Sequence, residues 1–550
     1  MIVDYNNNIS ENIKMNFDYI IIGGGSSGCV TANKLVNNNA NVLLIEEGGS
    51  DWNPLLRMPA GFIPMLNGSP YHRFHKSIPQ KQLNNRQHDI AQAKVLGGGS
   101  SINGMVYMRG RASDYEKWKS STNGGSWGWE DILENYIHLE ANQRLNNKYH
   151  GIDGPLKVSD ANYVVKGTDL YIKTMQELGL PHNSDFNDGN QYGVGLMQLT
   201  THNGKRCSAV EAFIKPIKHN KNLTIKLKSI VTKIILKKNK AVGVEVYHNR
   251  KISKYFANNE IISTAGTYIS PKLLMLSGIG DEAELSKHNI KTICKLPGVG
   301  KNLQDHHEVP FVAKTKKGYG YFKQDKGIRM LINGLQYLLF KSGPVSSNAA
   351  ETCAFLNPRN LKDQNDPPIK LYCVQVMYTD RDTKDIKPTH GLTLTSCIMN
   401  PEARGDVKLR SSNPLDLPLI NPNFFSKSND LSLILDSVKF ARTVIETKPL
   451  KDIVLSEILP GKNITNDIDL KNYCKRTVKT NWHPVGTCKM GNDKDPEAVL
   501  NSNLQVRGID NLRIFDVSMM PNLVSGNTNA PAMAIADRAT DLMLSSKSQN

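Results

Sequence analysis

The chain has 550 residues, 39% of them hydrophobic, and a formal net charge of +17. This length allows two or three domains, and because no run of eighteen apolar residues occurs, we expect no transmembrane helix. The lysines stand singly or in short runs without interleaved aromatic residues. We therefore interpret the charge as a solvated surface rather than a site for nucleic acid or an anionic membrane.

The N-terminus lacks the basic and apolar pattern of a signal peptide. Met15 stands two residues before the first predicted strand, so residues 1–14 are either a disordered extension or lie upstream of the true start. The eight cysteines are scattered, without C-x-x-C or zinc-site spacing. These patterns predict reduced thiols, no metal site and a cytoplasmic enzyme, with membrane association left open.

A strand, a glycine-rich turn and a helix open the organised part of the chain. The apolar run 19–22 predicts a buried parallel strand, and it leads into a G-x-G-x-x-G motif formed by Gly23, Gly25 and Gly28. The following helix offers unpaired N–H groups to phosphates. A second apolar run, 42–45, ends at Glu46, whose carboxylate can accept hydrogen bonds from ribose. The pattern predicts a dinucleotide site; the alternative is a glycine-rich turn that binds nothing.

Two further segments follow that favour ligand contact. The proline-rich stretch 51–85 is too long for a simple connection, so we expect it to wrap a ligand or another domain. Segment 93–115 contains three successive glycines, 97–99, followed by Ser100 and Ser101. Such a turn brings N–H groups and hydroxyls against a flat or anionic ligand, and Asn103 can both donate and accept. The alternative is a loop kept for chain reversal.

The middle of the chain predicts helices at 131–139 and 169–178, and then a β-meander inserted in a doubly wound fold. Its strands are expected within 223–236, 241–247 and 254–256. A buried strand at 260–263 precedes a helix at 272–276, with Ser270 as N-cap and Pro271 in the first turn.

Residues 311–478 predict a second domain carrying an antiparallel sheet. Its patterns include a helix at 327–340 and strands at 371–377 and 392–398. The last seventy residues are expected to return to the nucleotide domain, with a strand at 512–515 ending at Asp516 and a helix at 532–544.

Five separated stretches resemble the glucose–methanol–choline (GMC) oxidoreductases, which are FAD-dependent. They are the glycine motif with Glu46, segments 93–115, 266–280 and 296–306, and the segments around His483 and Asn527. The resemblance spans about residues 17–545 and implies an α/β fold (α+β overall). A Rossmann-like FAD-binding domain of the glutathione-reductase type is interleaved with a substrate domain built on an antiparallel sheet. The implied FAD segments are 17–157, 221–310 and 479–546, and the substrate segments are 158–220 and 311–478.

The same resemblance implies residue roles. His483 and Asn527 form the catalytic pair. Ile102 occupies the position where some family members attach the flavin to a histidine, which implies non-covalent FAD. The implied cofactor-binding residues are Gly23, Gly25, Ser26, Ser27, Gly28, Glu46, Gly99, Asn103, Gly104, Val106, Val231, Gly266, Trp482 and Asp516.

The predicted reaction is oxidation of an alcohol to an aldehyde or ketone. It removes a hydroxyl proton and a hydride, and the hydride needs a cofactor as acceptor. Neutral His483 suits the proton, and Asn527 can hold the oxygen in line without titrating. We expect a small-molecule alcohol as substrate and oxygen, a quinone or another carrier as electron acceptor.

Three other functions stay open at this point. They are a hydroxynitrile lyase with structural FAD, an NAD-dependent dehydrogenase with one Rossmann unit, and a flavin-binding protein without catalysis.

Two reactive side chains outside these motifs also need an interpretation. Cys488 is expected to be structural rather than a nucleophile, and Glu351 is either a pocket residue or a structural carboxylate.

Overall fold

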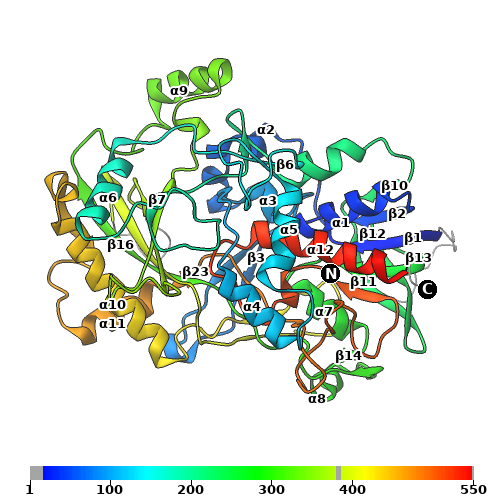
Figure 1. Ribbon diagram of the computed structural model, residues 1–550. Coiled ribbons are helices and arrows are strands. Elements are labelled where there is room, and N and C mark those ends of the chain that lie inside the picture. Colours follow the sequence, from blue (N-terminus) through cyan, green and yellow to red (C-terminus); the bar gives the residue numbers. More distant parts are fainter. Residues whose placement is uncertain (1–15, 379–385, 548–550) are drawn as a thin grey trace.

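The computed structural model describes residues 16–378 and 386–547. The prediction about residues 1–14 lies outside this range. Two large sheets dominate the molecule, one on each side in Figure 1, and each has its own hydrophobic core. This arrangement confirms the predicted fold class, while the predicted domain boundaries stay a prediction.

The first sheet has seven strands, and its central part is parallel. In spatial order they are β10 (Leu223–Lys226), β2 (Val42–Ile45), β1 (Asn16–Ile22), β13 (Lys251–Ser263), β12 (Lys240–His248) and β11 (Ile230–Lys237), with β24 (Leu512–Ile514) also paired to β13. Helices α1 (Ser26–Asn37) and α12 (Asn529–Lys547) pack together against this sheet. Strand β2 and residues 19–22 of β1 are apolar and buried because the central strands of such a sheet are covered on both faces.

Three details of the first sheet correct the predictions. The two strands expected at 254–256 and 260–263 are one strand, β13, which pairs antiparallel with β12 and then parallel with β1. Strand β10 lies at the parallel edge beside β2, outside the meander. Helix α7 (Ile269–Leu276) begins before Ser270, so Tyr268 and not Ser270 is its N-cap. The Ser270 hydroxyl instead donates to the Asp516 carboxylate, 2.6 Å away.

The second sheet is antiparallel, as predicted. Its order is β22 (Val454–Leu459), β16 (His307–Thr315), β19 (Gly391–Ile398), β18 (Ile369–Val374), β17 (Thr352–Leu356) and β7 (Gly193–Leu196), with β23 (Lys479–Thr480) paired to β16. Helices α6 (Lys166–Glu177) and α10 (Ser428–Glu446) pack on it. The strand β7 comes from a segment far upstream of the others, so the chain enters this sheet twice.

The other α-helices are α2 (Pro54–Arg57), α3 (Gly99–Ile102), α4 (Ala112–Ser121), α5 (Trp129–Leu139), α8 (Glu282–Ser286), α9 (Gly327–Phe340) and α11 (Asp467–Thr477). The remaining strands are β3 (His72–Lys76), β4 (Asp89–Ala93), β5 (Glu140–Asn142), β6 (Leu156–Val158), β8 (Thr201–His202), β9 (Lys205–Arg206), β14 (Ile279–Gly280), β15 (Cys294–Lys295), β20 (Asp406–Lys408) and β21 (Leu419–Asn421). Short irregular helices are η1 (Pro59–Asn67), η2 (Lys81–Leu83), η3 (Val210–Ile214), η4 (Lys215–Ile217), η5 (Pro344–Ser346), η7 (Leu450–Asp452) and η8 (Val517–Met519). Within the described residues, no helix is both long and apolar enough to cross a membrane.

Candidate active site

The glycines of the first motif are required for different reasons. Gly23 has φ +103°, a conformation that favours glycine, and a Cβ on Gly28 would lie 2.0 Å from the Gly23 carbonyl oxygen. A Cβ on Gly25 would meet nothing within 4 Å. Gly25 is also the N-cap of α1, and it supplies no side-chain cap. The space beside Gly25 and the exposed N–H groups of α1 together suit a phosphate.

Ser26 and Ser27 join the first helix to the last one. The Ser26 hydroxyl donates to Asn529 Oδ1 at 2.8 Å, and the Ser27 hydroxyl donates to the Ala532 carbonyl at 3.0 Å. Their hydroxyls are thus engaged by α12. The backbone N–H groups at the start of α1 are what these residues can offer to a phosphate.

Glu46 lies buried at the end of β2. Its carboxylate accepts from the Gly24 N–H at 2.8 Å and from the Gly48 N–H at 2.7 Å. Burial raises the pKa of Glu46, and these two N–H groups oppose that effect. The Ser229 N–H donates to the Glu46 backbone carbonyl at 3.0 Å, so the start of β11, which carries Val231, lies near the Glu46 backbone.

The second glycine segment packs directly on the first. The Gly97 N–H donates to the Gly24 carbonyl at 2.7 Å, and a Cβ on Gly98 would lie 2.7 Å from the Gly25 Cα. Gly99 faces open space, since a Cβ there would meet nothing within 4 Å. The two glycine segments therefore form one continuous backbone surface, with open space beside Gly25 and Gly99.

A buried arginine, which sequence reasoning missed, holds the loop after this surface. Arg206 donates to Asn103 Oδ1 and to the Asn103 carbonyl, both at 2.6 Å, and to the Leu56 carbonyl at 2.8 Å. Burial lowers the Arg206 pKa to about 9. Gly104 accepts from the Asn348 side chain, and Val106 forms a β-bridge with Leu199. No motif marks Arg206 in the sequence, because its partners lie in distant segments of the chain.

Asp516 ties together the ends of two parallel strands. Its Oδ2 accepts from the Gly266 N–H at 2.9 Å and from the Ser270 hydroxyl, while Oδ1 accepts from the Ser518 N–H at 2.9 Å. Gly266 has φ +83°. The carboxyl ends of β13 and β24 thus meet beside β1, at the edge of the sheet where a dinucleotide binds in doubly wound folds.

The predicted catalytic pair comes together across the fold. His483 follows β23, Asn527 precedes α12, and their side chains meet with Asn527 Nδ2 3.1 Å from His483 Nε2. The His483 backbone N–H donates to Asp305 Oδ1 at 3.0 Å. The neighbouring Trp482 has φ +58° and is 42% exposed. This left-handed turn leaves Trp482 partly exposed while His483 is held by Asp305.

Hydrogen bonds set the tautomer of His483. His306 Nε2 lies 3.0 Å from the Met399 carbonyl, which can only accept, so this nitrogen carries the proton. Because neutral His306 then has a bare Nδ1, His483 Nδ1, 3.0 Å away, must donate to it. The lone pair of His483 Nε2 is therefore free to accept from Asn527. His306 ends segment 296–306, and no local feature of the sequence predicts its contact with His483.

Burial and nearby positive charge keep both His483 and His306 neutral. Burial, the neighbouring His306 and the Lys370 ammonium lower the pKa of His483 well below its usual value. Burial lowers the pKa of His306 to about 3. The buried Lys370 donates from Nζ to Asn527 Oδ1 at 2.9 Å, which turns the Asn527 amide nitrogen toward His483. Burial has the opposite effect on the carboxyl group of Asp305, whose pKa it raises to about 7.

Comparisons with known proteins decide the family. Residues 17–308 and 401–536 match the N- and C-terminal family models described as GMC oxidoreductase. The chain belongs to the GMC oxidoreductase family. It is 37% identical over 536 residues to an alcohol dehydrogenase [acceptor] of Pseudomonas putida, and the match covers 96% of each chain. It is 35% identical over 531 residues to an oxygen-dependent choline dehydrogenase of Sinorhizobium fredii, again covering 96% of each.

Solved GMC structures share the whole fold. Pyridoxine 4-oxidase from Mesorbium loti superposes with a TM-score of 0.86 at 28% identity, covering 96% of this chain and 99% of that one. A formate oxidase structure gives a TM-score of 0.88 at 25% identity, covering 98% of this chain and 100% of that one. The protein is an FAD-dependent GMC oxidoreductase. Because the relatives named here are dehydrogenases and oxidases, the comparisons do not support the lyase alternative.

The residues of the two glycine segments and Glu46 also fit FAD. A dinucleotide needs an approach to the backbone, a helix N-terminus and an acid at the end of the second strand. Open space beside Gly25 and Gly99, the start of α1, and Glu46 meet these needs. The second glycine segment extends this surface beyond a single Rossmann unit, which counts against the NAD-dependent alternative.

Cys488, which was expected to be structural, and Glu351, which was left open, are both buried inside the protein. Cys488 is fully buried, and burial raises its thiol pKa well above the usual value, so it is no nucleophile. Glu351 is also fully buried, and its carboxylate accepts from Thr168 and Ser347, each at 2.8 Å, and from Tyr321. A carboxylate with these three donors is bound within the protein and is not a free pocket residue.

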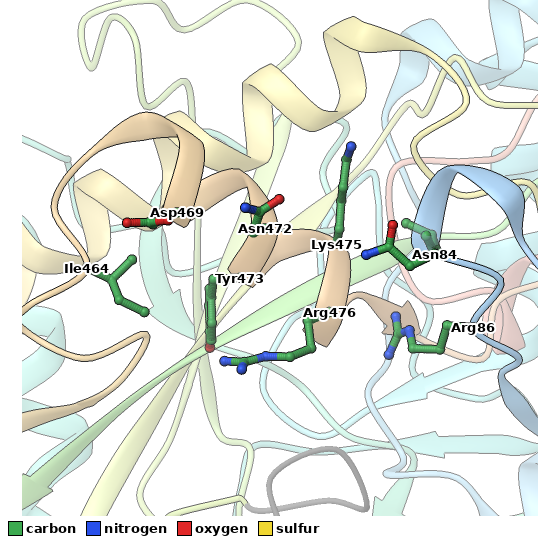
Figure 2. Close-up of a pocket in the computed structure, with 9 residues that line it drawn as sticks. Asn84, Arg86, Ile464, Asp469, Asn472, Tyr473, Lys475 and Arg476 are labelled. Carbon is green, nitrogen blue, oxygen red and sulfur yellow. The ribbon is translucent and has the colours of Figure 1, made fainter.

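A surface pocket lies away from this machinery, between η2 and α11 (Figure 2). Its volume is about 430 Å³. The lining residues are Leu83, Asn84, Arg86, Ile464, Asp469, Asn472, Tyr473, Lys475 and Arg476. The pocket includes no residue predicted to bind the cofactor or to act in catalysis.

Proposed function

We propose that this GMC enzyme oxidises an alcohol to an aldehyde or ketone, with His483 as the base and Asn527 holding the substrate oxygen. The observation that carries the proposal is the bare Nε2 of a neutral, partly buried His483 facing the Asn527 amide at 3.1 Å. A substrate hydroxyl can take over this hydrogen bond. It would donate to His483 Nε2 and accept from Asn527 Nδ2.

The side chains around the pair have distinct tasks. FAD held on the two glycine segments supplies the hydride acceptor. His483 Nε2 takes the hydroxyl proton, and His306 Nδ1 accepts from His483 Nδ1 throughout, which keeps the ring in the right tautomer. Lys370 fixes the Asn527 amide so that its N–H₂ group faces the substrate oxygen. Both side chains are only partly buried, so a substrate can reach them, while the surrounding protein strengthens these polar contacts.

We further propose that the preferred substrate is an uncharged alcohol. The Lys370 ammonium contacts a side chain of the catalytic pair: it lies 2.9 Å from Asn527 Oδ1 and is 6% exposed. A quaternary ammonium substrate would bring a second positive charge close to it. In a buried site that repulsion is costly, and it discriminates against choline-like molecules. The relative named alcohol dehydrogenase [acceptor] supports the same choice.

Choline is the second candidate, and Glu308 favours it. Glu308, Cys397 and Lys370 are partners in one row across β16, β19 and β18, so the carboxylate lies on the face that carries Lys370. Glu308 accepts from Tyr372 and Asn481, and Lys479 lies 3.8 Å from it. These partners reduce the negative charge that Glu308 can offer to a cation. The relative named choline dehydrogenase supports this candidate.

A matched pair of substrates separates the two candidates. Anaerobic flavin bleaching is measured with choline and with its carbon isostere, in which a tert-butyl group replaces the trimethylammonium group. We expect faster bleaching by the isostere at limiting concentration, and a shift toward choline of at least about tenfold in Lys370→Met. A wild-type preference for choline that Glu308→Gln removes would establish the second candidate. Bound flavin that no alcohol bleaches would contradict alcohol oxidation.

We also propose a cytoplasmic location and an electron acceptor that is oxygen or a diffusing carrier. All eight cysteines are free, and seven are buried, as suits a reducing compartment. Mixing the alcohol-bleached enzyme with air tests the acceptor. Rapid recovery of the flavin absorbance indicates an oxidase, and slow recovery indicates a carrier such as a quinone.

A further inference from the structure

Helix α9 (Gly327–Phe340) has its apolar side chains turned away from the protein. Its buried residues are the polar Asn333 and the phenol-bearing Tyr337. The side chains exposed by more than half are Ile328, Met330, Leu331, Ile332, Leu335, Leu338, Leu339 and Phe340. An amphipathic helix on a water-exposed protein surface does the reverse and buries its apolar stripe. This face therefore marks a contact with a membrane or with another protein.

Local contacts hold α9 in this orientation. The Asn333 amide donates to the Gln324 carbonyl at 2.8 Å, at the inner side of the helix. Lys341 ends the helix with φ +52°, and its ammonium lies 4.9 Å from the Tyr337 ring centroid. The apolar face is thus presented by a defined helix. Figure 1 shows α9 projecting from the side of the second sheet.

The polar surroundings of α9 are predominantly basic, although the exposed Asp325 stands beside Lys326 before the helix. The helix itself contains no acidic residue, and it carries Arg329 in its first turn. Lys317, Lys323 and Arg329 all lie close enough to His390 to lower its pKa, after the larger effect of burial. Lys326 and Lys341 stand at the two ends of the helix. A strongly apolar face with a basic border matches an anionic lipid surface in both respects.

The dimensions of α9 also fit a lipid surface. Fourteen residues form a helix of about 21 Å, too short to cross a bilayer but suited to lie in its interface. Beside the helix, η5 packs on both α9 and η1. In η1, Ile63 is 42% exposed. A second copy of the chain would need acidic groups to meet the basic border, and α9 supplies none of its own.

We propose that α9 is a membrane-surface helix, which lies in the headgroup boundary of a bilayer containing anionic lipid and docks the enzyme there. On this proposal, part of the net charge of +17 serves membrane contact, whereas the sequence analysis expected a solvated surface. The proposal rests on α9 and its border, and it holds for any substrate.

The first test is flotation of the FAD-loaded protein with vesicles of phosphatidylglycerol and phosphatidylcholine. The variant replaces Ile328, Leu331, Leu335 and Leu338 with Gln, which keeps helix propensity. A control variant replaces four exposed apolar residues elsewhere, Ile152, Ile293, Leu455 and Ile468, with Gln. We expect the wild type and control to float and the α9 variant to bind at least about tenfold less. Flavin content and reduction by alcohol should be the same in all three.

The basic border gives a second, independent test. Replacing Lys323, Lys326 and Arg329 with Gln leaves the apolar face intact and should weaken flotation on phosphatidylglycerol vesicles more than on pure phosphatidylcholine. Wild-type protein that stays unbound with every vesicle would overturn the proposal. So would equal loss of binding in the control variant. If the wild type instead forms a dimer without lipid and fails to bind vesicles, while the α9 variant is a monomer, that result would assign the face to self-association.

Discussion

At the scale of single residues, the basicity of His483 depends on partners far away in the sequence. The Met399 carbonyl orients His306, His306 orients His483, and Lys370 orients Asn527. Each link is a hydrogen bond whose direction follows from what the partner can donate or accept. The reacting nitrogen is thereby defined without any charged residue touching the His483 ring.

The first prediction concerns His483 itself. His483→Ala should keep FAD and lower the rate of flavin reduction by roughly 10²–10⁴-fold, the usual range for losing a positioned base. Asn527→Ala should also slow reduction, and the two losses should not add, because both side chains act on one oxygen. Stopped-flow bleaching of the single and double variants measures this. Near-normal reduction in His483→Ala would remove the residue from the mechanism.

The pH dependence has a definite sign. The base acts when neutral, and burial lowers the His483 pKa, so protonation requires a pH well below the ordinary histidine range. The reduction rate at limiting alcohol should stay level as pH falls through about 6.5 and decline at lower pH. A decline near pH 7 that disappears in Asp305→Asn would belong to Asp305, whose pKa is about 7.

His306 should act as a positioning residue. His306→Phe removes the acceptor for His483 Nδ1–H, frees the ring to change tautomer, and should lower kcat at least about tenfold with little change in KM. His306→Gln keeps an acceptor oxygen and should recover part of the rate. The comparison is made on flavin reduction at saturating alcohol. Equal losses in the two variants would show that His306 serves packing alone.

At the scale of elements, the glycines in the turn between β1 and α1 serve two purposes: some are needed for folding and one is needed for binding. Gly23 and Gly28 satisfy the backbone of the turn, whereas Gly25 faces open space. The second glycine segment then packs on the first through Gly98. A motif that looks uniform in the sequence therefore contains positions with different tolerance to substitution.

Two substitutions at this turn should behave differently. Gly25→Val has room for its side chain and a compatible φ of −77°, so it should fold but lose FAD, because the branched side chain fills the space beside α1. Gly28→Val places a Cβ about where the Gly23 carbonyl oxygen lies and should destabilise the protein itself. Flavin content and thermal unfolding of the FAD-free proteins distinguish the two. Normal FAD retention in Gly25→Val would contradict the assignment of this glycine.

At the scale of the whole molecule, the chain crosses several times between the two cores. Within the first sheet, the long strand β13 takes part in both antiparallel and parallel pairing. Phe256 in β13 pairs with Gly243 of β12 and with Asn16 of β1. The catalytic pair lies where elements of both sheets meet, since Lys370 comes from β18 and Asn527 precedes α12. A site built in this way needs both parts to be folded.

The mode of FAD attachment is a prediction for the intact protein. Ile102 offers no nucleophilic atom, so purified protein should be yellow and release all of its flavin on denaturation. Acid precipitation followed by absorbance of the supernatant measures the released fraction. Colour that stays with the precipitate would indicate a covalent link at another residue.

The sequence by itself determined the features that depend on local pattern. Strand β2 and helix α9 have the predicted bounds, since continuous apolar runs and helical periodicity are local signals. The glycine motif and Glu46 were also readable, because their spacing along the chain reflects one βαβ unit. His483 and Asn527 came from a family resemblance, and their contact had to be found in the fold.

Only the tertiary structure decided what depends on contacts between distant segments. It joined two predicted strands into β13, because strand breaks depend on pairing partners as well as on composition. It revealed Arg206, His306 and Lys370, whose roles come from atoms far away in sequence. It also showed that α9 turns its apolar side chains outward. Periodicity predicts that a helix has an apolar face, but the packing of the rest of the chain determines which way that face points.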